Sequence, residues 1–512
     1  MKSKVFLPIL CLLLSGCSLL EPSQSNNEST IFSSSSEEES LVSEPIFSLD
    51  NSGKESIDFS SLSRIEESDY SNSSINENSI VKLDFYNFND LHGAIEYSSS
   101  LNEPGIERLS TYLLDEKNKN PNGFVLTSSG DMWQGSALSN MFKGSAINDW
   151  MNYLGFSCMA LGNHEFDWGV NVIKDNMKDL NFPIISSNII DKTTNELADW
   201  VFPTYAKEVN GVNIGFIGAI GEGQTSDILA SISYTLDFTD PTSYVKAAAK
   251  KLKDDGADLV VLLFHDEAAN ITYDMVRYAD VVFCGHTHSK EVVKKYSIPT
   301  VQSKSNGQGI SHISLNFNKN TKEITYGTSE SIDMRYKSLN PDSGTTAILN
   351  SYLTPEVDAK LNNVLGNLPV NLSKDAATEL LTEYMYNYYQ DYIEDDSIGY
   401  SIYATNYNKS RSAMSSGNIT YKDVFKCFPF DNNLVVMKVK GSSLKTINYG
   451  VFYIPSEETL IDSKDYFIFT IDYIAEYDVY YAPSLGVEIV ARFQDLLPRD
   501  IFAEYFAREF RA

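Results

Sequence analysis

Short apolar runs alternate with amphipathic stretches from residue 81 onward. We expect strands at 81–88, 124–128, 157–161, 183–187, 212–218, 259–264 and 281–284. We expect helices at 105–117, 146–154, 170–180 and 241–254, and closing strands at 298–302 and 310–317. Strands that alternate with helices in this way predict a layered α/β fold in which helices cover the sheets.

The pattern changes after residue 342. Residues 343–367 predict a helix that serves as a linker. Residues 368–512 combine mixed α/β signals with many tyrosines and contain no histidine. We therefore expect two folded parts, one at 81–342 and a smaller, separate α/β domain at 368–512.

The first 80 residues predict export and a tether. Lys2 and Lys4 precede an apolar stretch, 5–14, that is too short to span a bilayer and is followed by Ser15-Gly16-Cys17. This ending resembles the lipobox of bacterial lipoproteins, which implies removal of 1–16 and a lipid on Cys17. The alternative is an ordinary cleaved signal with an incidental cysteine. Residues 17–80 are rich in Ser, Asn and Glu, which predicts a disordered tether on the extracellular face of the bacterial cell membrane.

Charge and cysteine content narrow the possible partners. The net charge of -29 argues against a nucleic-acid polymer, although metals and a few local cations would still allow a single nucleotide to bind. Five cysteines are too few for a disulfide scaffold, and Cys158, Cys284 and Cys427 lie in apolar contexts typical of buried free thiols.

Five of the six histidines lie beside Asp, Asn or Gly at the ends of short apolar runs. The segments are Asp90-Leu91-His92-Gly93, Gly162-Asn163-His164-Glu165-Phe166-Asp167, Phe264-His265-Asp266 and Gly285-His286-Thr287-His288, with a matching Gly130-Asp131 pair. Histidine and carboxylate are ligands for borderline transition metals, and ligands in α/β folds bind beyond the carboxyl ends of strands. The pattern predicts one polynuclear metal site, whereas any single motif could also be a structural histidine.

These motifs resemble the calcineurin-like metallophosphoesterases. Their order, their spacing and the second domain are similar to the secreted 5′-nucleotidase family, which includes cyclic nucleotide phosphodiesterases and UDP-sugar hydrolases. The resemblance extends from Val81 to at least Asp478, and the string 162–167 is its most specific element. It implies a four-layer β-sandwich flanked by helices at 81–342, followed by a substrate-binding domain at 368–512.

The resemblance also implies the roles of the metal-type residues. Asp90, His92 and His288 would hold one divalent ion, Asn163, His265 and His286 a second, and Asp131 would bridge the two. Zn, Mn, Fe and Co all suit this ligand set. Two cations about 3.5–4 Å apart would activate a shared water for in-line attack on phosphorus. His164, oriented by Asp167, would contact the phosphoryl or leaving-group oxygen.

The second domain carries candidate substrate contacts. By resemblance these are Asn406 and Arg411 for phosphate or ribose, Phe430 and Tyr473 for stacking on a nucleobase, and Asp478 for a ribose hydroxyl. Phe430 could instead belong to the core, Tyr473 to the core or the surface, and Asp478 to an ordinary loop. The family's paired glycines before the arginine are replaced by Asn408, Lys409 and Ser410, and a glycine pair near Asp478 is missing.

The leading interpretation is a surface-anchored phosphohydrolase that acts on nucleotides and releases nucleoside and phosphate. The same chemistry on 2′,3′-cyclic nucleotides, UDP-sugars or a non-nucleotide ester is the first alternative, because the recognition segments are altered. A binding or adhesion lipoprotein without activity is the second, and the intact ligand set argues against it.

Overall fold

The computed structural model describes residues 79–228, 230–389, 402–407, 410–446, 451–453, 461–476, 487–494 and 496–511. It also describes the backbone of two short strands, β1 (Ser48–Leu49) and β2 (Glu55–Ser56), which pair antiparallel within the segment expected as a tether. The expected signal peptide and Cys17 lie outside the described residues. Residues 44–512 form one compact unit, and within the described part no helix combines the length and hydropathy of a membrane span.

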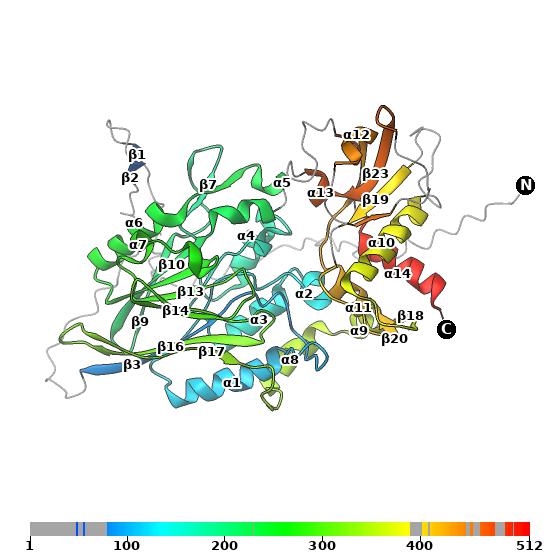
Figure 1. The fold of residues 1–512 in the computed structure, drawn as a ribbon. Helices are drawn as coiled ribbons and strands as arrows, with labels where there is room; N and C mark the ends of the chain where they lie inside the picture. The colour runs from blue at the N-terminus through cyan, green and yellow to red at the C-terminus, as the bar shows by residue number, and fades with distance from the viewer. Residues whose placement is uncertain are drawn as a thin grey trace, which may run out of the picture. The chain divides into compact units, whose positions relative to one another are not determined.

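Two six-stranded sheets form the first part of this unit (Figure 1). The first has the order β17 (Ile324–Asp333), β16 (Gly309–Asn318), β3 (Ile80–Phe88), β4 (Phe124–Ser128), β5 (Cys158–Ala160), β6 (Ile184–Ile185). The second has the order β14 (Glu291–Lys295), β15 (Ile298–Gln302), β13 (Val281–Cys284), β12 (Leu259–His265), β10 (Val212–Ile220), β9 (Thr204–Val209). Strands β3 to β6 run parallel, as do β10, β12, β13 and β15. The strands expected from the sequence are therefore present, and they are confirmed.

The alternation of side chains along the strands explains the layers. Leu83 and Phe85 of β3 pack with Phe216 of β10 in the core between the sheets. Tyr86 and Phe88 point the other way and join a second core with the helices. Helices α1 (Ile106–Lys119), α3 (Ser145–Leu154), α4 (Val170–Asp179) and α8 (Ser343–Tyr352) contribute to that core.

Helices α6 (Pro241–Asp254) and α7 (Tyr273–Val276) cover the other sheet (Figure 1). The result is the expected four-layer sandwich flanked by helices. The shorter elements of this part are α2 (Ala137–Met141), η2 (His164–Phe166), β7 (Ile189–Asp191), β8 (Glu196–Leu197), η3 (Glu222–Asp227), α5 (Ala230–Ser233), β11 (Leu236–Phe238) and η4 (Ala268–Asn270).

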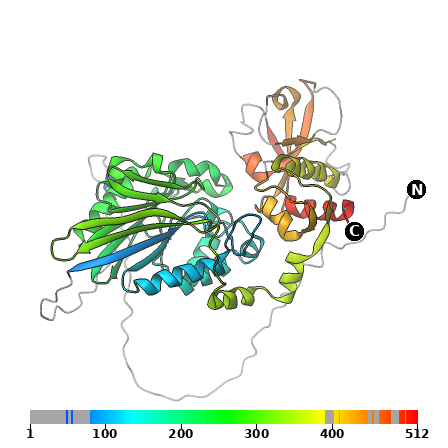
Figure 2. The same ribbon diagram turned by 60° about the horizontal axis from the view of Figure 1, so that its bottom comes forward.

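The single linker helix expected at 343–367 is wrong. The segment forms α8, then α9 (Pro355–Asn362), then strand β18 (Val364–Leu368), and the chain turns between the two helices (yellow-green in Figure 2). The Thr354 side chain caps α9 and Pro355 stands at its first position, where a residue without an N–H begins a helix but cannot continue one.

The last part is the expected smaller α/β domain. A mixed five-stranded sheet has the order β22 (Val451–Tyr453), β19 (Ile402–Tyr407), β23 (Asp465–Ile471), β21 (Leu434–Lys440), β24 (Glu488–Phe493), and β18 pairs with β20 (Gly417–Thr420). Its helices are α10 (Lys374–Tyr388), α11 (Tyr421–Cys427), α12 (Gly441–Leu444), α13 (Asp472–Glu476) and α14 (Pro498–Glu509). Phe428, Phe469 and Phe502 are among the residues of its core.

Candidate active site

The loops that carry the metal-type residues all leave the carboxyl ends of parallel strands. Strand β3 precedes Asp90 and His92, β4 precedes Asp131, β5 precedes Asn163, β12 ends at His265, and β13 precedes His286 and His288. The two sheets bring these ends together, so the predicted convergence is found in the structure.

Five of these residues have left-handed backbones. Their φ angles are 52° at Asp90, 49° at His92, 58° at Asp131, 74° at His286 and 58° at His288. Such a conformation is unusual for residues other than glycine, and it clusters where surrounding structure holds a functional side chain in place. The Asp90 and His92 N–H groups donate to the Gly130 and Asp131 carbonyls at 3.0 and 2.9 Å, which ties the first two loops together.

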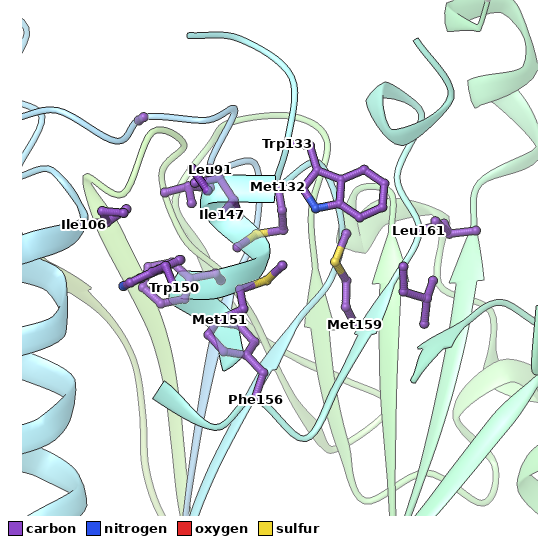
Figure 3. Close-up of a cluster of buried hydrophobic side chains, with 14 of the residues drawn as sticks. Leu91, Ile106, Met132, Trp133, Ile147, Trp150, Met151, Phe156, Met159 and Leu161 are labelled. Atoms are coloured by element: carbon purple, nitrogen blue, oxygen red, sulfur yellow. The ribbon is translucent and has the colours of Figure 1, made fainter. Parts of the chain in front are cut away.

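Neighbouring apolar side chains anchor the strained loops in the core. Leu91, Met132, Trp133 and Leu161 come from the three loops after β3, β4 and β5, and all four side chains are fully buried. Figure 3 shows them gathered with Ile147 and Met151 of α3. Burial of these side chains supplies the packing that stabilises the strained backbone beside them.

The side chains form two adjoining groups. In the first, the His92 and His288 Nε2 atoms lie 2.9 Å apart and the Asp90 carboxylate lies 3.5 Å from His288. In the second, the Asp131 carboxylate lies 3.3 Å from His265 Nε2. Asn163 Oδ1 lies 3.1 Å from both His265 Nε2 and His286 Nδ1, so all seven predicted metal residues converge.

The donor set fits divalent cations. Asp131 Oδ2 is buried and has no hydrogen-bond partner among the described residues, although it faces the ring nitrogens of His92 and His265. Three sets of donor atoms lie within 4.8 Å of one another: Asp90, His92 and His288; His92, Asp131 and His164; and Asp131, His265 and His286. A bound cation would give Asp131 Oδ2 a partner. It would also explain why so many potential ligand atoms face each other.

The protonation of three of the four predicted histidine ligands suits this role. Burial lowers the pKa of His92 and of His286, and lowers that of His288 to about 4, with the Arg411 charge adding to the effect at His288. These rings are therefore neutral at pH 7, which is the form that binds metals. At His265, burial is outweighed by the negative charges of Asp131 and Asp90, which raise the pKa to about 10.

Glu165 is a structural part of the site that the sequence analysis missed. Its buried carboxylate accepts hydrogen bonds from the N–H groups of Asp131, Met132 and Gly162, each at 2.8 Å. It thereby joins the loop after β4 to the loop after β5. The signal available in the sequence was its place inside the 162–167 string.

His164 is held on several sides, as its predicted role requires. Its Nδ1 lies 3.0 Å from the Asp167 carboxylate, and its backbone N–H donates to Asp131 Oδ1 at 2.8 Å. Burial lowers its pKa, but the charges of Asp167 and Asp131 outweigh burial and raise it to about 9. The ring is therefore a proton donor near neutral pH.

A cavity of about 500 Å³ opens over these groups. Its lining includes Asp131, Asn163, His164, Asp167, His286 and His288 from the sandwich, and Arg411, Phe430, Asp431, Asn432 and Tyr473 from the second domain. The Phe430 ring stacks on His164 at 5.5 Å, and the Arg411 guanidinium lies 5.4 Å from the Phe430 ring. Three predicted substrate contacts thus line one cavity with the metal-type residues, whereas Asp227, which also lines it, was missed.

The other two predicted substrate contacts are not located by the structure. Asn406 lies on β19 opposite Phe452, but its side chain is outside the described residues. Asp478 also lies outside them. The three cysteines predicted as free thiols, Cys158, Cys284 and Cys427, are buried and unpaired.

The Pro429 carbonyl fixes the loop that presents Phe430. Gln134 Nε2 and Asn140 Nδ2 both donate to this carbonyl, at 3.0 and 3.1 Å. Arg499 donates to the Phe430 carbonyl at 2.9 Å. The carbonyl groups that precede and follow the Phe430 Cα are both fixed by side chains. These contacts hold the aromatic ring in its place beside His164.

Comparison with known proteins agrees with this architecture. Residues 83–290 match the calcineurin-like phosphoesterase model, and residues 364–447 match the model of the 5′-nucleotidase C-terminal domain. The chain belongs to the 5′-nucleotidase family of metallophosphoesterases. Members of this family are hydrolases that use divalent metals, and the predicted family and fold class are confirmed.

The proteins that are similar to this chain differ in length and in the activity that their names state. The chain is 26% identical to the endonuclease YhcR of Bacillus subtilis, over 76% of this chain but 34% of that protein. It is 27% identical to the 5′-nucleotidase of Rattus norvegicus, over 71% of this chain and 70% of that protein. The crystal structure of a 5′-nucleotidase precursor from Thermus thermophilus superimposes with a TM-score of 0.70 at 21% identity, covering 84% of this chain and 97% of that one.

Proposed function

We propose that this metallophosphoesterase is a hydrolase of nucleotide phosphate esters, anchored at the cell surface through Cys17. The observation that carries the proposal is the cavity that joins the unpartnered Asp131 oxygen and its ring of histidines to Phe430 and Arg411. One wall has the chemistry to hold metals and the other the chemistry to hold an aromatic, anionic substrate.

Two divalent ions would be held by the residues that converge at the strand ends. Asp90, His92 and His288 would bind one ion, Asn163, His265 and His286 the other, and Asp131 would be shared between them. When bound, such ions supply positive charge for the phosphoryl oxygens and lower the pKa of a water.

The protein's own groups would carry the remaining steps. His164 would donate its proton, or a hydrogen bond, to a phosphoryl or leaving-group oxygen, and Asp167 would keep the ring in that orientation. Arg411 would bind anionic oxygens, and the Phe430 ring would stack on the base. Tyr473, Asn406 and Asp478 remain predicted contacts to the base and ribose.

A substrate panel tests the proposal. The protein purified without residues 1–17, which lie outside the 44–512 unit, would be given Mn²⁺ or Zn²⁺ and 5′-AMP, 3′-AMP, 2′,3′-cyclic AMP, UDP-glucose, p-nitrophenyl phosphate or single-stranded DNA. We expect preferred release of phosphate from a nucleotide and none from Asp131→Asn. Products of UDP-glucose, the cyclic ester and DNA would be resolved by chromatography.

Two outcomes would contradict this assignment. Turnover of p-nitrophenyl phosphate alone would leave the metal chemistry standing and remove the nucleotide. Metal binding without turnover of any ester would favour a binding protein.

A further inference from the structure

Asp227 lies against the outer edge of one predicted metal ligand. It ends the short helix η3 and lines the cavity, and one oxygen of its carboxylate lies 3.7 Å from His286 Nε2. The other ring nitrogen, Nδ1, lies 3.1 Å from Asn163 Oδ1 on the metal side. The imidazole therefore stands between the predicted metal position and a carboxylate.

Two other ligands show what this arrangement does. His92 Nδ1 lies 3.2 Å from the Gln134 carbonyl oxygen, and His265 Nδ1 lies 2.7 Å from the Ser129 carbonyl oxygen, while their Nε2 atoms face the site. An imidazole that binds a metal is neutral and carries one proton, so an acceptor on the outer nitrogen leaves the inner nitrogen with its lone pair. At His286 the inner and outer nitrogens are reversed, and Asp227 takes the place of the carbonyl.

We propose that Asp227 is a positioning residue that keeps the proton on Nε2 of His286 and so presents Nδ1 to the second metal ion. The inference rests on the proposed function, because it assumes that His286 binds metal. A carboxylate in this position also makes the ring a stronger ligand, since its charge favours positive charge on the imidazole.

The side chain has the freedom that this role requires. The Asp227 and His286 side chains are 40% and 28% exposed, so neither is locked in place by close packing on all sides. Among the described residues, the ring of His286 is the one basic group within 4 Å of the Asp227 carboxylate. Its neighbour in the same helix, Glu222, is exposed and serves as a matched control.

Metal affinity gives the first test. Apoprotein lacking residues 1–17 would be titrated calorimetrically with Mn²⁺ and with Zn²⁺, comparing wild type, Asp227→Ala, Asp227→Asn, Asp227→Glu and Glu222→Gln. We expect one binding step to weaken about 10–100-fold in Asp227→Ala, as loss of such carboxylates does elsewhere, with partial recovery in Asp227→Glu. Glu222→Gln should match wild type, and circular dichroism would confirm that each variant is folded.

The tautomer gives a second test that needs neither metal nor activity. With ¹⁵N-labelled histidine, the His286 signals, assigned by their loss in His286→Gln, should report a proton on Nε2 in the apoprotein. Asp227→Ala should shift the ring toward a mixture of tautomers. An unchanged tautomer together with unchanged metal affinity would overturn the proposal.

The two tests also separate this inference from the proposed function. If wild type bound neither metal, the dimetal assignment would fail, while the tautomer would still report whether Asp227 controls the ring. If wild type bound metal and Asp131→Asn did not, but Asp227→Ala bound as wild type, only the role of Asp227 would be lost.

Discussion

The ring of His164, as distinct from its backbone N–H, is held by groups that are not predicted metal ligands. Asp167 orients its ring, Asp131 receives its N–H, and Phe430 covers its face. Truncation of this ring should therefore leave the seven convergent donors in place. That separation allows the contribution of the proton donor to be measured on its own.

We predict that His164→Ala lowers kcat by about 10²–10⁴-fold, the usual contribution of a positioned acid or base. Metal content, measured by mass spectrometry after dialysis, should equal that of wild type. Asp167→Asn should give a smaller loss, because the ring remains and only its orientation weakens. Full activity in His164→Ala would remove this residue from the mechanism.

At the scale of single residues, the sequence predicted the metal-type positions and missed their supports. A scarce ligand type placed after several strands is visible in the sequence, as at His92 and His265. Glu165 and Asp227 gain their significance from N–H groups and a ring nitrogen contributed by other loops. Contacts of this kind depend on the folded geometry, which residue type and spacing do not encode.

The loops after β4 and β5 act as a pair because one carboxylate joins them. Glu165 accepts from the N–H groups of Asp131 and Gly162 through one oxygen and from Met132 through the other. An amide at this position would present its own N–H group to one of these donors. Two donors would then face each other in a buried place.

We expect Glu165→Gln to lower the free energy of unfolding by about 1–3 kcal/mol, the cost of leaving a buried donor unsatisfied. Metal affinity should fall as well, because Asp131 and Asn163 lie on the two loops. Chemical denaturation and calorimetric titration measure these effects. Glu196→Gln, at an exposed position on β8, is the control and should change neither.

A buried carboxyl on strand β3, that of Asp84, lies outside the group of metal-type residues. Asp84 receives hydrogen bonds from Asn120 and from Lys82, at 2.8 and 2.9 Å, and lies 3.1 Å from His312 Nε2. Burial raises the pKa of Asp84, but hydrogen bonds from His312, Lys82 and Asn120 outweigh it and hold the pKa below the usual value. The ionised carboxyl therefore stabilises the folded state.

The sign of this effect gives a pH prediction. A carboxyl whose pKa is lower in the folded state stabilises the fold above its unfolded pKa, about 4, and loses that contribution as the pH falls. Asp84→Asn should lower Tm at pH 7 and flatten the fall of Tm below pH 4. Melting curves from pH 2.5 to 7 check this, with the exposed Glu208→Gln expected to follow wild type.

At the scale of elements, strands were predicted better than the linker. Strands β4, β13 and β15 begin and end where the apolar runs do, because both faces of a covered sheet are buried. The break at Pro355 follows a local signal, a capping threonine before a proline, whereas the final strand of the segment 343–367 depends on the pairing of β18 with β20. The pairing partner lies some fifty residues away, beyond the reach of local pattern.

The cavity is a feature of the whole molecule, because the sandwich supplies one of its walls and the second domain supplies the other. Phe430 and Arg411 come from the second domain and the metal-type residues from the sandwich. Recognition of the base should therefore be separable from hydrolysis of the ester.

We predict that Phe430→Ala raises KM for AMP by about tenfold or more, because base–aromatic stacking contributes about 1–3 kcal/mol. Glycerol phosphate, which has no ring, should be hydrolysed by the variant much as by wild type. Steady-state kinetics on both substrates decide the matter, with the exposed Tyr336→Ala as control. Equal losses on the two substrates would argue against stacking.

The left-handed backbones at the metal-type residues make this site a place where stability and activity are opposed. Replacing His288, at a φ of 58°, with glycine removes a ligand and also removes about 1 kcal/mol of backbone strain. In EDTA, His288→Gly should melt at the same temperature as wild type or higher. Loss of activity at such positions would then leave abundance and solubility intact, so damaging mutations here would pass unnoticed in any screen that counts only folded protein.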